Sequence, residues 1–303
     1  MHKYKAFGLN IASEMEISDL LPCDTDETDV MIRMGKVPDV FDDVTMQSAN
    51  RKIGKDRFLL DNKNIAKFYV EKGSLIIAEP YCNSLFEEIK LYLLGSCMGA
   101  LLYQRKTLPL HGSCIQYRGK GVLLTGKSGA GKSTIASALF EKGCTLVTDD
   151  VAAIKFGESG PFVYPSYPSQ KLWEDAIRRM GKKGEMSTLV RVSDAFNKYS
   201  VVNRDYFTNI PTHLKVIFEI LPAAAEKMTI EEIKGSAKVE IVVKNTYRRF
   251  MTKAMGLKEW HFHQCVAVAD KTKIYRITRP QGEHLENEIA AIVFEKLKSA
   301  ENE

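Results

Sequence analysis

The sequence predicts an α/β fold, because strand-like and helix-like segments alternate in the stretch from residue 121 to residue 148. Residues 121–125 (GVLLT) are apolar and favour a strand, residues 132–142 (KSTIASALFEK) favour a helix, and residues 144–148 (CTLVT) favour a second strand. Strand, helix and strand joined by short links form a βαβ unit, which predicts a parallel sheet.

The beginning of the chain has a different pattern. Residues 56–70 and 74–78 are rich in Phe, Leu, Ile, Tyr and Val, which is typical of strands, and Gly73 offers a turn between them. We therefore expect a small β-rich N-terminal domain at residues 1–83 and a larger α/β domain at residues 84–303.

The composition limits the possible functions. The 303 residues are 45% hydrophobic and 27% charged, which is ordinary for a globular protein with a sizeable core. The net charge of +5 suits a polyanionic ligand such as a nucleotide but is too small to predict DNA or RNA binding. The six cysteines form no CxxC pair, so a zinc site is not expected.

The chain also lacks the usual membrane signals. Its first residues are not followed by the apolar segment of a signal peptide, and no run approaches the roughly 18 apolar residues of a membrane span. We expect a cytoplasmic protein with no nucleic acid and no membrane as partner, and a homo-oligomer is left open.

Further helices and strands follow from apolar spacing. A helix is expected to begin at Ser84, where the run SLFE has capping-box spacing, and Pro109 is expected to end this segment. Later patterns predict a central strand at 214–221, helices at 236–251 and 258–268, a strand at 274–277 and a last helix at about 283–297.

Residues 126–133 read GKSGAGKS, a complete match to the G-x-x-x-x-G-K-[ST] pattern of a phosphate-binding P-loop. Glycines let the backbone turn its N–H groups inward around an anion, and the dipole of the following helix adds to the attraction. Lys132 is expected to bind the β- and γ-phosphates and Ser133 to offer its hydroxyl to Mg²⁺. A glycine-rich turn that only caps a helix is the alternative. The pattern predicts ATP and Mg²⁺ as cofactors, although no motif identifies the base, with nucleotide-binding residues Gly126, Ser128, Gly129, Ala130, Gly131, Lys132, Ser133 and Thr134.

Two acids directly follow the second strand. Asp149 and Asp150 are expected to lie over the phosphates, because the strand ends beside the P-loop strand. Adjacent strand residues point in opposite directions, so two acids suit two roles. Our hypothesis is that Asp149 serves the metal and that Asp150 is the general base for the acceptor hydroxyl. A plain turn at a strand end is the alternative.

His111 precedes the P-loop strand. Residues 112–117 and 121–125 are expected to form a hairpin, which would bring His111 to the strand end near the phosphates. The residues alone leave a structural and a catalytic role equally open.

The string HGSCIQYRGKGVLLTGKSGAGKSTIASALFEKGCTLVTDD at residues 111–150 resembles the catalytic core of the HPr kinase/phosphorylase family. The resemblance implies that His111, Lys132 and Asp150 are catalytic, that Ser133 binds Mg²⁺, and that Asp150 accepts the proton during serine phosphorylation. It also implies a P-loop kinase core of the type shared with ATP-dependent phosphoenolpyruvate carboxykinase.

The chain departs from this family outside the core. The metal-binding Glu expected after the two acids has no certain counterpart, and Glu174 and Asp175 are the nearby candidates. The arginine-bearing signature linked to the phosphorylase reaction is not recognisable.

Over a longer stretch the chain is similar to the serine kinases that modify lasso-peptide precursors. The similar positions are Tyr167, Pro168, Leu172, Trp173, Tyr247, Arg248, Arg249, Phe250, His261, Phe262, Tyr275, Arg276, Arg279 and Pro280. This similarity implies phosphorylation of the C-terminal serine of a ribosomally made peptide. Lys198 could stabilise the transferred phosphate or be a surface lysine. Arg248 and Arg249 could bind a peptide carboxylate or pair with acids.

These patterns together predict a Mg-ATP-dependent serine kinase that acts on a peptide or small protein. An HPr-type protein kinase, a carboxykinase-like or small-molecule kinase, and a nucleotide-sensing module without turnover are the alternatives.

Overall fold

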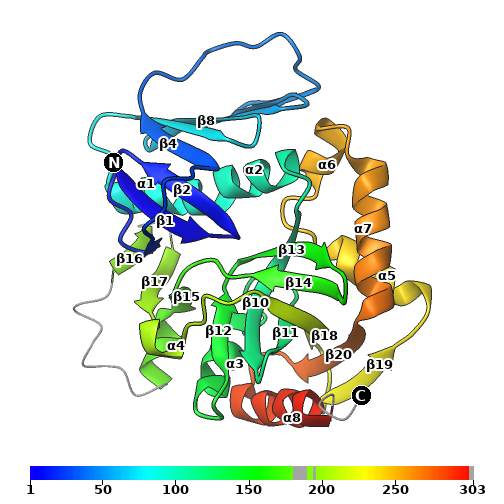
Figure 1. The fold of residues 1–303 in the computed structure, drawn as a ribbon. Coiled ribbons are helices and arrows are strands. Elements are labelled where there is room, and N and C mark those ends of the chain that lie inside the picture. Colours follow the sequence, from blue (N-terminus) through cyan, green and yellow to red (C-terminus); the bar gives the residue numbers. More distant parts are fainter. Residues whose placement is uncertain (180–189, 194–195, 300–303) are drawn as a thin grey trace.

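A computed structural model describes residues 1–179, 190–193 and 196–299 (Figure 1). It shows an α/β fold whose N-terminal part is rich in strands, as the sequence predicts. Among the described residues, no helix is both long and apolar enough to cross a bilayer.

The N-terminal part forms one nine-stranded sheet in the order β3-β1-β2-β4-β9-β8-β7-β6-β5. Its strands are β1 (His2–Ala6), β2 (Leu9–Ser13), β3 (Leu21–Pro22), β4 (Val30–Met34), β5 (Met46–Ser48), β6 (Arg51–Ile53), β7 (Arg57–Asn62), β8 (Ala66–Glu71) and β9 (Leu75–Pro80). The stretch 56–70 contributes two strands, because Asn64 adopts a φ of 86° between them, a conformation suited to a tight turn. The boundary at residue 83 stays a prediction.

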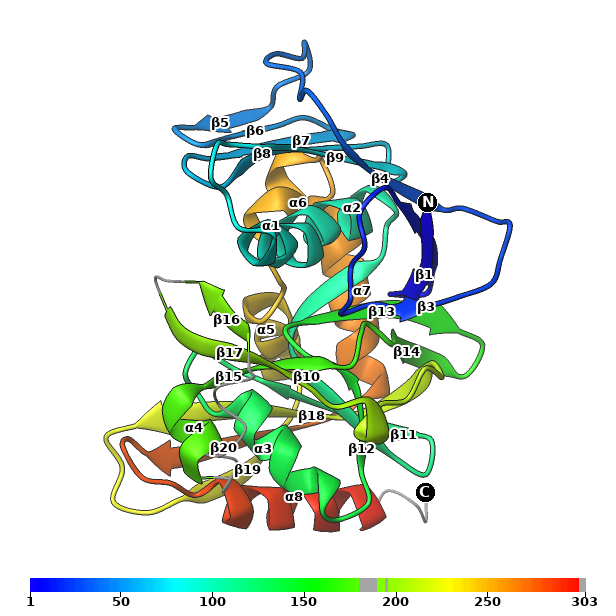
Figure 2. The same ribbon diagram turned by 90° about the vertical axis from the view of Figure 1, so that its left-hand side faces the viewer.

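A helical segment lies under this sheet and joins it to the rest of the molecule (Figure 2). It consists of α1 (Phe86–Tyr92), a π-helical turn η1 (Leu93–Cys97) and α2 (Met98–Gln104). The predicted capping box is wrong, because the Ser84 hydroxyl donates to the carbonyls of Ile65 and Tyr81 instead of capping the helix. Pro109 does not end the helix either: it lies inside the next strand.

The central sheet has eight strands, in the order β11-β10-β13-β14-β18-β20-β19 with β12 paired to β10. They are β10 (Leu108–Tyr117), β11 (Lys120–Thr125), β12 (Thr145–Thr148), β13 (Val151–Gly157), β14 (Gly160–Tyr164), β18 (Thr212–Ala223), β19 (Thr229–Ile233) and β20 (Lys273–Pro280). The prediction of a parallel sheet is wrong in part. Strand β10 folds back as the predicted hairpin and pairs antiparallel with both β11 and β12, so it separates the two strands of the expected βαβ unit.

Helices cover both faces of the central sheet. Apolar side chains of β11 alternate: Val122 and Leu124 pack in the core shared with α3 (Lys132–Phe140) and α8 (Glu286–Ser299), and Leu123 packs toward α5 (Ser236–Lys244) and α7 (Lys258–Lys271). This alternation explains why the strand is apolar throughout.

The predicted helix at 236–251 is interrupted. It divides into α5 and α6 (Phe250–Ala254), because the intervening backbone pairs with β10. The His111 N–H donates to the Asn245 carbonyl at 2.8 Å, and the Tyr247 N–H donates to the Pro109 carbonyl at 2.9 Å. These bonds bring residues 245–247 beside His111.

A small third sheet stands over α3 (Figure 2). Its order is β15-β17-β16, formed by β15 (Ser169–Trp173), β17 (Phe196–Val202) and β16 (Val190–Ser193), and β15 continues into α4 (Glu174–Arg179). A short 3₁₀ turn, η3 (Arg204–Tyr206), follows β17. This sheet and the end of β12 border the P-loop.

Candidate active site

The P-loop connects the end of β11 to α3. Gly126, Gly129 and Gly131 have φ values of 135°, 83° and 95°, which side chains with a Cβ rarely adopt. A Cβ at Gly126 would also lie 2.4 Å from the Ile220 carbonyl oxygen. The backbone conformation of the loop therefore requires glycine at these positions.

Lys132 begins α3 and reaches back along the loop. Its ammonium donates to the carbonyls of Gly126 at 3.0 Å and Lys127 at 3.1 Å. Burial lowers the pKa of Lys132 and outweighs the nearby Asp149 and Asp150, which raise it. The charge is thus held inside the loop, where a phosphate chain would bind.

Asp149 is fixed by three donors. One carboxylate oxygen accepts from the Ser133 hydroxyl at 2.9 Å and from the Ser113 hydroxyl, and the other accepts from the Lys171 N–H at 3.0 Å. The structure therefore brings the two residues expected to serve the metal, Ser133 and Asp149, into direct contact.

This pair fits the oxygen chemistry of Mg²⁺, which binds through one or two protein groups, waters and phosphate oxygens. Within the described residues, no group of three or more His, Cys, Asp or Glu side chains is placed to hold a metal without a nucleotide. A small donor set of hydroxyl and carboxylate suits a metal shared with a triphosphate.

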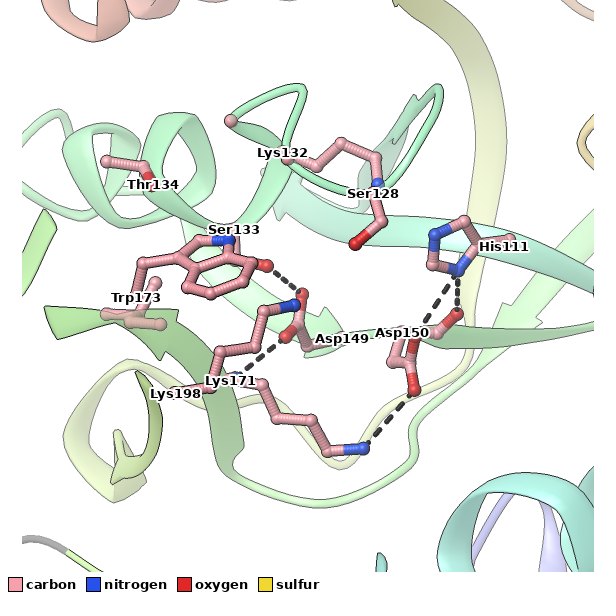
Figure 3. A pocket seen from close by; sticks show the side chains of 13 residues that line it. His111, Ser128, Lys132, Ser133, Thr134, Asp149, Asp150, Lys171, Trp173 and Lys198 are labelled. Atoms are coloured by element: carbon pink, nitrogen blue, oxygen red, sulfur yellow. Dashed lines mark hydrogen bonds and ion pairs between the residues drawn. The ribbon is translucent and has the colours of Figure 1, made fainter. Parts of the chain in front are cut away.

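Asp150 faces away from Asp149 (Figure 3), but strand alternation is not the reason, because β12 ends at Thr148 and both acids follow it. Its φ of 71° turns the chain, and its carboxylate lies 3.3 Å from His111 Nδ1 and 3.2 Å from Lys171 Nζ. His111 Nδ1 also lies 3.0 Å from the Asp150 carbonyl oxygen. Burial alone would raise the pKa of Asp150, but Lys171 and His111 outweigh it and lower the pKa below its ordinary value.

Lys171 is the main site residue that the sequence reasoning missed. Its backbone holds Asp149 while its side chain holds Asp150. Burial would lower the pKa of Lys171, but Asp150 overcomes this and raises it. A signal existed in the run SQKLW: Lys171 and Trp173 alternate with buried Leu172, as on a strand with one polar face.

Trp173 and Lys198 complete this side of the site. They are paired across β15 and β17, and Lys198 Nζ lies 4.7 Å from the indole ring centre, a cation–π contact. Lys198, whose role the sequence left open, thus borders the cavity (Figure 3).

These side chains line one cavity of about 80 Å³, here called the catalytic cavity. Predicted residues on its wall are His111, Ser128, Gly129, Gly131, Lys132, Ser133, Thr134, Asp149 and Asp150. The remaining two, Gly126 and Ala130, line a larger cavity of about 460 Å³ on the other side of the P-loop, together with Arg179 and Arg279.

Some candidates lie elsewhere. Glu174 bonds to Arg178 at 3.0 Å and Asp175 to Arg179 at 2.8 Å, and neither lines the catalytic cavity, so the structure does not bring a further acid from α4 to Asp149. His261 is buried and lies 2.8 Å from the Thr246 hydroxyl, so it packs in the core.

Comparison with known proteins identifies the relatives of this segment. The family model described as HPr Serine kinase C-terminal domain matches residues 104–163. An HPr kinase/phosphorylase from Chlorobaculum tepidum is 56% identical over 54 residues, covering 18% of this chain and 15% of the relative. Another from Burkholderia lata is 32% identical over 184 residues, covering 54% of this chain and 51% of the relative.

The chain thus spans about half or less of the length of these curated relatives. A solved structure, the HPr(Ser) kinase/phosphatase from Coxiella burnetii, aligns with a TM-score of 0.31 and 15% identity, covering 64% of this chain and 98% of that chain.

Proposed function

We propose that this chain, whose core is related to the HPr serine kinase C-terminal domain, is a Mg-ATP-dependent kinase that transfers the γ-phosphate to a serine hydroxyl of a peptide or small protein. The observation that carries the proposal is the ion-paired Asp150 carboxylate, which lines the same cavity as the P-loop lysine, Lys132. A P-loop that only sensed nucleotide would not require this second group.

In the proposed reaction, Asp150 orients the acceptor hydroxyl and takes its proton. A carboxylate with a lowered pKa is a weak base, but phosphoryl transfer needs more positioning than basicity, because its transition state is loose. His111 and Lys171 keep the carboxylate ionised and aimed at the cavity. Lys132 stabilises negative charge on the phosphates.

Ser133 and Asp149 are the residues that would hold Mg²⁺. When bound, the metal ion neutralises charge on the phosphate oxygens. The hydrogen bonds from Ser113 and the Lys171 N–H to Asp149 would keep that carboxylate oriented. The larger cavity beside Ala130 is the space we assign to the nucleoside, with Arg279 as a wall: its guanidinium donates to the Ala130 carbonyl at 3.3 Å.

For the acceptor, we propose the C-terminal serine of a lasso-peptide precursor. The support is the sequence similarity that includes Trp173 and Tyr247, and both residues border the reacting groups: Trp173 lines the catalytic cavity, and the Tyr247 ring lies 6.1 Å from the His111 ring. An HPr-type kinase is the second candidate, because the curated relatives are HPr kinase/phosphorylases.

The test is incubation of the purified chain with Mg·[γ-³²P]ATP and, in parallel, HPr or a lasso precursor that ends in serine. Mass spectrometry would locate the added phosphate. Labelling of the precursor supports the proposal, and labelling of HPr alone supports the second candidate. Tight ATP binding without labelling of any acceptor would instead favour the nucleotide-sensing module.

A further inference from the structure

Another cavity lies between the N-terminal sheet and the central part of the chain, apart from the catalytic cavity and the larger cavity beside the P-loop. It measures about 250 Å³, and its wall includes Arg51 from β6, Ser96 from η1, and Arg248 and Phe250 from the segment around the start of α6. We call it the arginine cavity. No acidic side chain stands among its lining residues in the described part of the chain.

The two arginines of this cavity have no carboxylate partner among the described residues. Arg57, Arg105 and Arg276 each form an ion pair with an acid, whereas Arg51 and Arg248 form none within the described residues. Arg51 Cζ instead lies 5.0 Å from the ring centre of Phe250, and Arg248 Cζ lies 5.6 Å from that of Tyr247. Arg51 Nε also donates to the Asn50 side-chain oxygen at 3.2 Å, so an anion in the cavity would meet the remaining N–H groups of Arg51 and those of Arg248.

A serine residue stands on the same wall. Ser96 lines the cavity and is 4% exposed, and its hydroxyl is not a buried atom without a partner; among the described residues only the Ser166 hydroxyl is one. A hydroxyl on a cavity wall can donate to an acceptor atom that binds there. Two guanidinium groups and a hydroxyl on one wall suit an anion.

The walls select among anions. The lining is mixed: Phe58, Leu60, Tyr92, Phe250 and Met251 are apolar or aromatic, and Asn50 and Asn62 are polar like Ser96 and the two arginines. Inorganic phosphate would contact only the polar groups, whereas an amino-acid residue with a carboxylate would contact both kinds. A carboxylate also matches the two-pronged geometry of a guanidinium.

One aromatic residue lies near both this cavity and His111. The Tyr247 ring lies 6.1 Å from the His111 ring, and the Arg248 Cζ lies 5.6 Å from the Tyr247 ring centre. Two glycines make room for this ring: a Cβ at Gly95, in the π-helical turn, would lie 3.2 Å from the tyrosine oxygen, and a Cβ at Gly99, in α2, would lie 2.9 Å from the ring. Such turns are frequent at functional sites.

We infer that the arginine cavity is a recognition site for a carboxylate of the acceptor peptide, bound by Arg51 and Arg248 with the Ser96 hydroxyl as a further donor. The acceptor role rests on the proposed kinase function, but the binding of a carboxylate does not.

Calorimetry without nucleotide tests the binding. The probes are N-acetylphenylalanine and N-acetylphenylalanine amide, which differ only in the carboxylate. We expect the wild-type chain to bind the acid at least about tenfold more tightly than the amide, because hydrogen bonds to charged groups are the strong ones. Arg51→Gln and Arg248→Gln should each weaken binding of the acid by about tenfold or more. Arg249→Gln is the matched control, because Arg249 is exposed and does not line the cavity, and it should bind as the wild type does.

Equal binding of acid and amide by the wild type would overturn the inference, even if both arginine variants failed to fold. Inorganic phosphate binding more tightly than the acid would overturn the assignment to a peptide carboxylate. A chain that binds the acid but phosphorylates no acceptor would refute the kinase proposal and leave the carboxylate site intact. An active kinase that binds the acid and the amide equally well would refute the carboxylate site and leave the kinase proposal intact.

Discussion

The two walls of the catalytic cavity are built differently. The core wall, residues 111–150, runs through β10, β11 and β12, whose strands lie in a sheet covered by helices on both faces. The outer wall, β15 and β17, belongs to a small sheet with its own minor cluster of Leu172, Ile177 and Val201. Side chains of the core wall are therefore fixed by a large buried core, and those of the outer wall by a few contacts.

The outer wall is tied to the core wall mainly by polar groups. Gln170 donates to the Ser133 carbonyl at 3.2 Å, and Lys171 reaches both acids. We expect substitutions in the core wall to abolish most of the turnover, and substitutions in the outer wall to reduce it by a smaller factor. The following predictions are ordered from the largest effect to the smallest.

Lys132→Ala should have the largest effect. It removes the buried charge of the P-loop, and we expect turnover to fall by about a thousandfold, as on removal of a group that stabilises transition-state charge. Lys253→Ala is the control, since Lys253 is exposed on α6 and lines neither the catalytic cavity nor the larger cavity assigned to the nucleoside. Initial-rate assays with saturating Mg·ATP would measure both. Unchanged turnover in Lys132→Ala would remove the P-loop from the mechanism.

Asp150→Asn preserves the shape of the side chain but removes the proton acceptor. General-base groups contribute on the order of a hundred- to ten-thousandfold, so kcat should fall by about that factor with little change in ATP affinity. Asp205→Asn is the comparison, since Asp205 is exposed and lines neither the catalytic cavity nor the larger cavity assigned to the nucleoside. Full activity of Asp150→Asn would exclude the base role, whatever its effect on stability.

Lys171→Met tests the outer wall. The variant keeps the N–H that binds Asp149 but loses the ammonium that bonds to Asp150. We expect turnover to fall by about ten- to a hundredfold, because charge-assisted bonds are worth about 1.5–3 kcal/mol. A variant as impaired as Lys132→Ala would contradict the proposed division between the walls.

The same variant should change the response to pH. Because Asp150 has a lowered pKa in the folded chain, its ion pairs contribute stability above the ordinary pKa of about 4, and this is lost as pH falls through the folded pKa. Without Lys171, burial should raise the pKa of Asp150. Acid unfolding and the acidic limb of kcat/KM should both move to higher pH, which circular dichroism and rate profiles would detect. An unshifted acidic limb would mean that another group sets it.

Trp173→Leu should have the smallest effect. It removes the ring beneath Lys198, a contact worth about 0.5–2 kcal/mol, so we expect a change of a few-fold to about thirtyfold in KM for ATP or in turnover. Lys198→Met should give a similar change, and the double variant should add little to either one. Independent, additive effects would show that the two side chains do not act as a pair.

The sequence by itself determined the core wall, because its chemistry is local. The P-loop, the His111 hairpin and the two acids lie within forty consecutive residues, and two local rules predict most of this segment: glycine for positive φ and alternation for a strand. The φ of 71° at Asp150, beyond the end of β12, follows from neither rule.

Tertiary structure alone decided the rest. Strand β10 lies between the two strands that were expected to be parallel neighbours. The helix expected at 236–251 is interrupted where its backbone pairs with β10 beside His111. Lys171, from a different sheet, contacts both acids. These outcomes depend on hydrogen bonds and ion pairs between residues far apart in the chain, which no local pattern specifies.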